Sequence, residues 1–284
     1  MSQISRRRLL GCVAGALSAP AALRAFADRV VKNGRLRQSV SRWPYQAIPL
    51  PDFCRACADM GLTAIDLLEE ADWPVVAQYG LVCSMGYAGG GSIRDGLNVI
   101  ANHDAVVKNF EKSIPRAAQL KVPNVITFFG NRRGMPDDQA TANCVAGLER
   151  VKQIAEDHGV TICVELLNSK VNHPDYQGDR TAFGVAIVKA VNSPRVKLLY
   201  DIYHMQIMEG DLIRTIRDNH QYIAHYHTGG VPGRHELDAT QEVNWATVCR
   251  AIVDTGFTGY LAHEFVPTRD PITSLREAVA LCDV

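Results

Sequence analysis

The sequence predicts a single α/β domain folded as a (β/α)8 TIM barrel, and three observations support this prediction. Short apolar segments rich in β-branched residues alternate with amphipathic helical segments along residues 36–284, and no linker interrupts them. This alternation repeats eight times. Four of the apolar segments end in a polar residue, and these end points lie 26 to 37 residues apart. One βα unit of such a barrel takes roughly 30 residues, so the spacing fits consecutive units.

Each strand is expected where an apolar run meets turn or polar residues, and each helix where apolar residues recur with helical spacing. The strands are expected at 36–41, 63–68, 81–85, 125–129, 160–165, 196–201, 222–227 and 259–264. The helices are expected at 51–61, 73–79, 104–120, 137–158, 181–191, 211–219, 244–255 and 270–281. The glycine-rich segment 87–91 is expected to be a loop, and it lacks the spacing of a dinucleotide-binding motif.

The charge balance excludes several classes of partner. Lys+Arg and Asp+Glu are both 30, so no basic field favours nucleic acid or an anionic membrane surface. The expected partner is a small molecule. The seven cysteines after residue 27 are scattered over expected helices and strands, which is not the pattern of a disulfide framework.

The first 27 residues have the form of an export signal. Arg6, Arg7 and Arg8 precede a weakly apolar stretch, and Ala25-Phe26-Ala27 follows as a cleavage site. Residues 1–27 are therefore predicted to be a twin-arginine signal, and the mature protein is expected in the periplasm or cell envelope. An uncleaved amphipathic N-terminus is the alternative interpretation.

Four polar residues at the ends of consecutive expected strands form a candidate metal site: Glu165, Asp201, His227 and Glu264. The carboxyl ends of all strands in a parallel barrel meet at one face, so these side chains are expected to converge. Three carboxylates and one imidazole suit one divalent ion, with Mn²⁺ or Mg²⁺ favoured and Co²⁺ or Zn²⁺ compatible. Any one of these acids alone would more often be a helix cap or a solvated loop residue.

The segments around these residues resemble a known family. Residues 165–168 (ELLN), 201–211 (DIYHMQIMEGD), 231–236 (VPGRHE) and 263–265 (HEF) resemble hydroxypyruvate isomerases, which belong to the xylose isomerase-like TIM barrels together with the ketose 3-epimerases. The resemblance covers roughly residues 36–267. It implies that Glu165, Asp201, His227 and Glu264 are the metal ligands, and that Glu165 and Glu264 are also the catalytic acid–base pair. Barrels of this family often associate, so a homo-oligomer is one open outcome.

One residue departs from the hydroxypyruvate isomerase pattern. Those enzymes tend to have Gln where this chain has His227, whereas ketose 3-epimerases have His. Both reactions begin when a base removes a proton beside a carbonyl and forms an enediolate. Return of the proton to the neighbouring carbon gives isomerisation, and return to the opposite face of the same carbon gives epimerisation. The leading prediction is a metal-dependent isomerase of a small hydroxycarbonyl compound, such as hydroxypyruvate.

The alternatives to that prediction come from three classes of protein. A ketose 3-epimerase uses the same ligands, and a non-catalytic envelope protein could bind sugar through the metal. Related barrels also include apurinic endonucleases, but a neutral chain argues against DNA as substrate.

Several further residues are candidate substrate contacts. His204 follows Asp201 by three residues and either binds a substrate oxygen or orients Asp201. Arg234 either binds a substrate carboxylate or phosphate or pairs with Glu236, and Glu236 is expected beside Arg234 or His235. Asn168 and His173 lie in a long loop that could act as a lid. Two other sets are weaker: the aromatic residues Trp43, Tyr45, Tyr87 and Phe129 are candidate pocket walls, and His225 shares the strand parity of His227 but lies further from the strand end.

Overall fold

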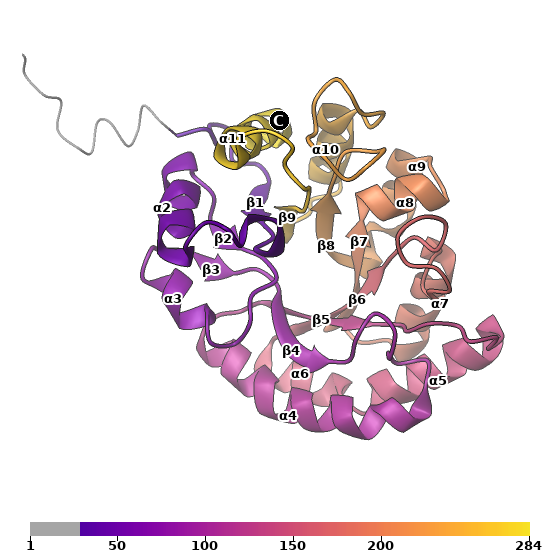
Figure 1. Ribbon diagram of the computed structural model, residues 1–284. Helices are drawn as coiled ribbons and strands as arrows, with labels where there is room; N and C mark the ends of the chain where they lie inside the picture. The colour runs from indigo at the N-terminus through magenta and orange to yellow at the C-terminus, as the bar shows by residue number, and fades with distance from the viewer. Residues whose placement is uncertain (1–28) are drawn as a thin grey trace, which may run out of the picture.

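The structure is a computed structural model that describes residues 29–284, so the predicted export signal at 1–27 lies outside the described residues. A ring of parallel strands is surrounded by helices (Figure 1). One sheet contains seven strands in the order β1-β9-β8-β7-β6-β5-β4. These strands are β1 (Arg37–Val40), β4 (Gly86–Gly90), β5 (Asn124–Phe128), β6 (Thr161–Leu166), β7 (Val196–Asp201), β8 (Ile223–Thr228) and β9 (Tyr260–His263).

Two short strands complete the ring. The strands β2 (Ala64–Ile65) and β3 (Val82–Cys83) pair with each other and form a separate sheet. Isolated parallel bridges join Ser41 to Asp66 and Leu68 to Gly86, so the pair is linked to both edges of the larger sheet. The predicted (β/α)8 class is confirmed.

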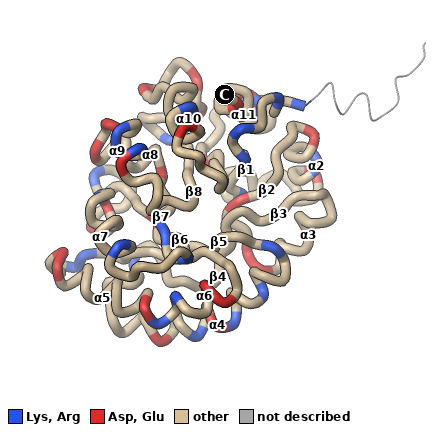
Figure 2. The backbone as a smooth tube through the Cα atoms, turned by 180° about the vertical axis from the view of Figure 1, so that it is seen from behind, with Lys and Arg blue, Asp and Glu red and all other residues tan. Residues whose placement is uncertain are grey.

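The helices pack outside the strands (Figure 1). They are α2 (Leu50–Met60), α3 (Trp73–Ala77), α4 (His103–Gln119), α5 (Asp137–Glu149), α6 (Lys152–His158), α7 (Thr181–Val191), α8 (Ile202–Met208), α9 (Leu212–Asn219), α10 (Trp245–Asp254) and α11 (Pro271–Cys282), with single 3-10 turns at Trp43–Tyr45, Ile100–Asn102 and His220–Tyr222. Basic and acidic residues are intermixed on these outer helices (Figure 2).

The glycine-rich segment predicted to be a loop is a strand. The expected strand 81–85 instead ends early as β3, and the chain continues into β4 across Gly86 to Gly90. A Cβ atom on Gly90 would lie 2.4 Å from the Ile126 carbonyl oxygen, so only glycine permits this close approach of β4 to β5. The predicted loop was wrong because Gly90 serves a close backbone contact with β5 and not a turn.

Two helix predictions also differ from the structure. The expected helix 137–158 is divided into α5 and α6 at Val151, a fully buried β-branched residue with φ −117°. The helix α8 was not expected; it starts directly at the end of β7, where the Asp201 carboxylate accepts a hydrogen bond from the His204 backbone N–H at 3.2 Å. Asp201 therefore caps a helix as well as ending a strand.

The strands around the site are buried on both faces, as expected for a parallel sheet covered by helices. All six residues of β6 are buried. The seven described cysteines are all free and buried. Among residues 29–284, no helix is long and apolar enough to cross a membrane.

Candidate metal centre

Glu165, Asp201, His227 and Glu264 converge at the C-terminal ends of four neighbouring strands. Each offers one ligand atom, and these four atoms all lie within 4.8 Å of one another. Asp201 and His227 are fully buried, and Glu165 and Glu264 are 5% and 4% exposed. The four residues that the sequence placed at strand ends thus form one compact cluster.

Strand register explains this convergence. Asp201 on β7 pairs directly with His227 on β8, and Glu165 on β6 pairs with Leu199 on β7. Glu264 follows the last residue of β9, and its N–H donates to the Thr228 carbonyl at 3.0 Å. Because the ladders are parallel, all four side chains are delivered at nearly the same height along the barrel.

The cluster brings three buried carboxyl groups together with only one imidazole. Burial raises the pKa of Glu165 even though His227 bonds to it, and burial raises the pKa of Asp201 to about 7. Burial acts in the same direction on Glu264, but the charges of Arg234 and His227 outweigh it and hold the pKa of that carboxyl well below its usual value. Two of the three carboxyls therefore resist ionisation unless a further cation is present.

The imidazole of His227 is oriented as a ligand. Its Nε2 bonds to Asp66 Oδ2 at 2.9 Å, while its Nδ1 is buried and faces the carboxylates of the cluster. That Nδ1 lies 2.6 Å from Glu264 Oε2, 3.5 Å from Glu165 Oε1 and 3.9 Å from Asp201 Oδ2. An imidazole fixed through one nitrogen, with the other facing three carboxylates, is the donor arrangement of a divalent-metal site. The four residues could thus hold one metal ion.

Arg234 lies over the cluster. Its Nη2 donates to Asp201 Oδ2 at 3.0 Å and also bonds to Glu264, while its Nη1 lies 3.1 Å from His204 Nε2. The guanidinium packs between the rings of Trp43 and Tyr203, at 5.5 and 5.2 Å from their centroids. Arg234 therefore faces the site, as its predicted substrate role requires.

Glu236 bonds to neither Arg234 nor His235, the two partners predicted for it. Its carboxylate accepts hydrogen bonds from the Thr268 N–H at 2.8 Å, the Thr268 hydroxyl at 2.9 Å and the Ser274 hydroxyl at 2.9 Å. These bonds hold the segment between β9 and α11. Because these bonds occupy both oxygens of the carboxylate, Glu236 has a structural role.

His204 reaches the cluster between Asp201 and Arg234. Its Nε2 lies 3.6 Å from Asp201 Oδ2, and its Nδ1 accepts from the Asn168 N–H at 3.2 Å. Burial and the neighbouring charge of Arg234 lower the pKa of His204 well below its usual value, so the ring is neutral at neutral pH. A neutral ring can exchange hydrogen bonds with a substrate hydroxyl or carbonyl.

The two loop residues differ in their positions. His173 is half-buried, lines the cavity and packs on the His204 ring at a centroid distance of 5.2 Å. Asn168 is fully buried, and its side-chain oxygen accepts from the N–H groups of Val171 and Asn172. Its amide nitrogen lies 2.6 Å from His204 Nδ1. Asn168 therefore holds the loop against His204 and is not among the residues that line the cavity; its predicted contact with substrate stays a prediction.

A cavity of about 300 Å³ opens onto the cluster. Glu165, Glu264 and Arg234 line its polar side, and Trp43, Tyr87 and Phe128 line its apolar side. The indole N–H of Trp43 donates to Glu264 Oε1 at 2.6 Å. Trp43 and Tyr87 thus occupy the predicted pocket wall, whereas Tyr45 and Phe129 are buried in the core and do not line this cavity.

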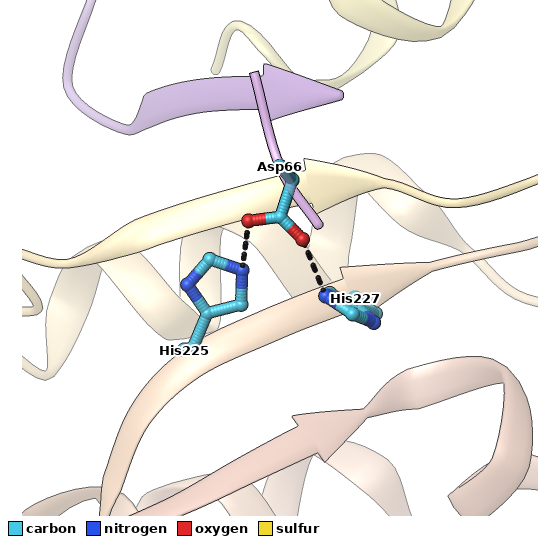
Figure 3. Close-up of side chains that lie close together, drawn as sticks. All are labelled: Asp66, His225 and His227. Atoms are coloured by element: carbon cyan, nitrogen blue, oxygen red, sulfur yellow. Dashed lines mark hydrogen bonds and ion pairs between the residues drawn. The ribbon is translucent and has the colours of Figure 1, made fainter. Parts of the chain in front are cut away.

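Asp66 and His225 lie directly behind the cluster. Asp66 was missed from the sequence, and His225 was considered there but ranked below His227. Figure 3 shows Asp66 between His225 and His227, with one carboxylate oxygen directed at each ring. Asp66 follows β2 inside the apolar run TAIDLL, where the expected strand extended past it to residue 68. The signal that the sequence offered was a single acidic residue, Asp66, near the end of this apolar run. That position puts Asp66 at the same end of the barrel as the four ligands.

The fold and the cluster together define a parallel (β/α)8 barrel with a carboxylate–imidazole cluster at its C-terminal face that could hold a metal ion. The sequence matches the family described as xylose isomerase-like TIM barrel over residues 37–283, and the chain belongs to this family.

Several relatives are isomerases and epimerases by name. A protein assigned as a hydroxypyruvate isomerase from Homo sapiens is 31% identical over 39% of this chain and 40% of its own length. A 2-oxo-tetronate isomerase from Cupriavidus necator is 32% identical over 47% and 52%, respectively. A D-psicose 3-epimerase from Agrobacterium fabrum is 29% identical over 62% and 63%. The chain thus spans about half the length of these relatives.

A solved structure shows the same fold. The AP endonuclease, family 2, from Brucella melitensis superposes with a TM-score of 0.77 at 22% identity, and the match covers 84% of this chain and 97% of that one. At this identity the likeness concerns the fold alone.

Proposed function

We propose that the protein is a metal-dependent isomerase that moves the carbonyl of a small hydroxycarbonyl compound through an enediolate. The observation that carries the proposal is the pair Glu165 and Glu264, two buried carboxylates that share one ligand cluster and line one cavity. The names of the relatives support the same class of reaction.

Glu165, Asp201, His227 and Glu264 would hold the ion, which supplies Lewis-acid stabilisation of negative charge on the substrate oxygens. The protein supplies the proton transfers. Glu165 and Glu264 are the candidate acid–base pair. Their shared cavity lets one carboxyl take a proton from carbon and the other return one.

Arg234, His204 and the cavity wall would select the substrate. The guanidinium of Arg234 lines the cavity, and its charge can attract a carboxylate such as that of hydroxypyruvate. The neutral ring of His204 can hydrogen-bond a hydroxyl or carbonyl oxygen. A cavity of about 300 Å³ is at the small end of ligand sites, which favours a compound of a few carbon atoms.

The second candidate is a ketose 3-epimerase, and one residue favours it. His227 takes the position where the resemblance expects His in epimerases and Gln in hydroxypyruvate isomerases. The D-psicose 3-epimerase relative supports this alternative. A metal-assisted sugar-binding protein without turnover would use the same ligands.

The test is proton NMR in D₂O, with Mn²⁺-loaded or Mg²⁺-loaded protein incubated with hydroxypyruvate and, separately, with ketoses. Deuterium should enter a carbon beside the carbonyl, and the product should distinguish isomerisation from epimerisation. Glu264→Gln and Glu165→Gln should each reduce the exchange by about 10²–10⁴-fold, the contribution of a positioned acid or base.

The control is Glu111→Gln, an exposed glutamate on α4, which should leave exchange unchanged. Protein that binds metal tightly but exchanges no deuterium with any of these compounds would contradict the enzyme proposal and favour the binding protein.

We also propose export by the twin-arginine route, on the basis of Arg6, Arg7 and Arg8 and the apolar stretch that follows. Cell fractionation tests this: the full chain should reach the periplasm, and replacement of Arg6 and Arg7 by Lys should retain it in the cytoplasm.

A further inference from the structure

A buried carboxylate lies behind the metal cluster and is not one of its ligands. Asp66 is fully buried between β1, β3 and β8, at the end of the shortest strand pair in the barrel. A charged group without solvent contact is costly unless its oxygens are bonded, so its partners indicate its role.

The carboxylate of Asp66 has four side-chain neighbours within 3.5 Å. Its Oδ1 accepts from the Ser84 hydroxyl at 2.6 Å and lies 3.1 Å from His225 Nε2. Its Oδ2 accepts from His227 Nε2 at 2.9 Å, and the Ser41 hydroxyl lies 3.5 Å away. Figure 3 shows the two rings approaching the two oxygens from β8. Both distances from Asp66 to the imidazole rings lie within hydrogen-bond range.

The bond between Asp66 and Nε2 of His227 determines the role of the second ring nitrogen, Nδ1. With Nε2 donating to Asp66, Nδ1 is the nitrogen that can bind a metal ion once it has lost its own proton, and Nδ1 lies 2.6–3.9 Å from the three carboxylates of the cluster. A neutral imidazole has one donor and one acceptor nitrogen, and the partner of the first selects the second.

We infer that Asp66 is a positioning residue for the metal centre: it holds His227 through Nε2, so that Nδ1 serves as the metal ligand. The inference rests on the proposed metal site and extends it to a residue that touches neither metal nor substrate. Carboxylate–imidazole partners of this kind contribute roughly 10–100-fold to metal affinity in other proteins.

Asp66→Asn is the decisive variant, because it keeps the shape of the side chain. An amide can donate its N–H to His227 Nε2, which places the ring proton on Nδ1 and blocks the ligand atom. Calorimetric titration of the metal-stripped protein with Mn²⁺ should show roughly 10–100-fold weaker binding than wild type. The Co²⁺-loaded variant should also have an altered visible absorption spectrum, because the nitrogen ligand is changed.

Two comparisons separate positioning from general stability. Ser84→Ala removes a different bond to the same carboxylate and should leave the Mn²⁺ affinity near the wild-type value. In a His227→Gln background, Asp66→Asn should cause no further loss, because the ring on which it acts is gone. A structural defect would lower affinity in that background too.

A measurement on wild-type protein decides the matter if Asp66→Asn does not fold. In Zn²⁺-loaded protein, NMR should detect a slowly exchanging proton on Nε2 of His227, bonded to nitrogen and protected from solvent. A proton on Nδ1 instead, or none on either nitrogen, would overturn the inference.

Unchanged Mn²⁺ affinity in folded Asp66→Asn overturns the inference alone and leaves the proposed function standing. A second bound ion per chain that Asp66→Asn removes also overturns it, because Asp66 would then be a ligand. Wild-type protein that binds no divalent ion overturns both the inference and the proposed function.

Discussion

The two halves of the barrel differ in regularity. The strands β6, β7 and β8 each contain six residues, whereas β2 and β3 contain two each. The regular half delivers Glu165, Asp201 and His227 through ladder register. The irregular half, which runs from β1 to β4, places Leu67 and Tyr87 in the cavity wall and Asp66 behind the cluster.

This difference assigns the halves separate tasks. Long paired strands fix side chains to within the tolerance that metal ligation needs, because each ladder bond limits the position of its neighbours. Where the strands are short, the backbone can depart from regular strand geometry. Leu67, directly after Asp66, adopts a left-handed φ of +52°. We expect changes in the regular half to alter metal binding and turnover, and changes in the irregular half to alter mainly the fit of the substrate.

The largest effect is expected from pH, and it tests the regular half. The pKa of Asp201 is about 7, and a carboxyl must lose its proton to ligate a metal. Each pH unit below about 7 should therefore weaken metal binding by about tenfold for this group, and affinity should level off above it. The pKa of His227 is also raised, so its imidazolium must release a proton too, and the slope should be steeper still.

Calorimetry between pH 5 and 8 measures this slope, and repetition in two buffers counts the protons released. In Asp201→Asn the proton count should fall by one. A constant affinity between pH 5 and 7 would show that the carboxyls are already ionised at pH 5. That result would contradict the raised pKa that burial gives Asp201.

The same group has a consequence for the stability of metal-stripped protein. A carboxyl whose folded-state pKa is raised above its unfolded value binds more protons when folded than when unfolded. The contribution of Asp201 therefore favours the folded state at low pH and is lost as pH rises through about 7. Bound metal should reverse this trend, because it binds only the ionised form.

The regular half is also the part that could be predicted from the sequence. Each of its strands has a polar, potentially metal-ligating residue at or next to its end, so the meeting of these residues at one face of the barrel follows from the sequence pattern. Asp66 could not be found in this way, because β2 has only two paired residues and the apolar run continues past it. The contacts of Glu236 with Thr268 and Ser274 join segments more than 30 residues apart, and no local pattern indicates them.

A smaller effect is expected for Arg234, which belongs to the loop after β8. Arg234→Lys keeps the charge but loses the planar fork that bonds Asp201, Glu264 and His204 together. Loss of one charged hydrogen bond costs about 1.5–3 kcal/mol, which corresponds to about 10–100-fold in kcat/KM. The loss should be greater for a substrate with a carboxylate than for a neutral ketose.

Steady-state kinetics with both substrates measures this difference, with Arg133→Lys on an exposed loop as the control. An equal loss for the two substrates would indicate that Arg234 organises the ligands and does not recognise the carboxylate.

The smallest effect is expected for Trp43, which follows β1 and closes the cavity from the irregular half. Trp43→Phe keeps an aromatic wall and a surface for the Arg234 guanidinium, but removes the N–H that donates to Glu264 Oε1. Loss of one hydrogen bond costs about 0.5–1.5 kcal/mol, so kcat should fall by about two- to tenfold. Because the metal ligands are untouched, Mn²⁺ affinity should stay close to wild type. A large loss of Mn²⁺ affinity in this variant would show that the irregular half also fixes the ligands, and would remove the division of tasks between the two halves.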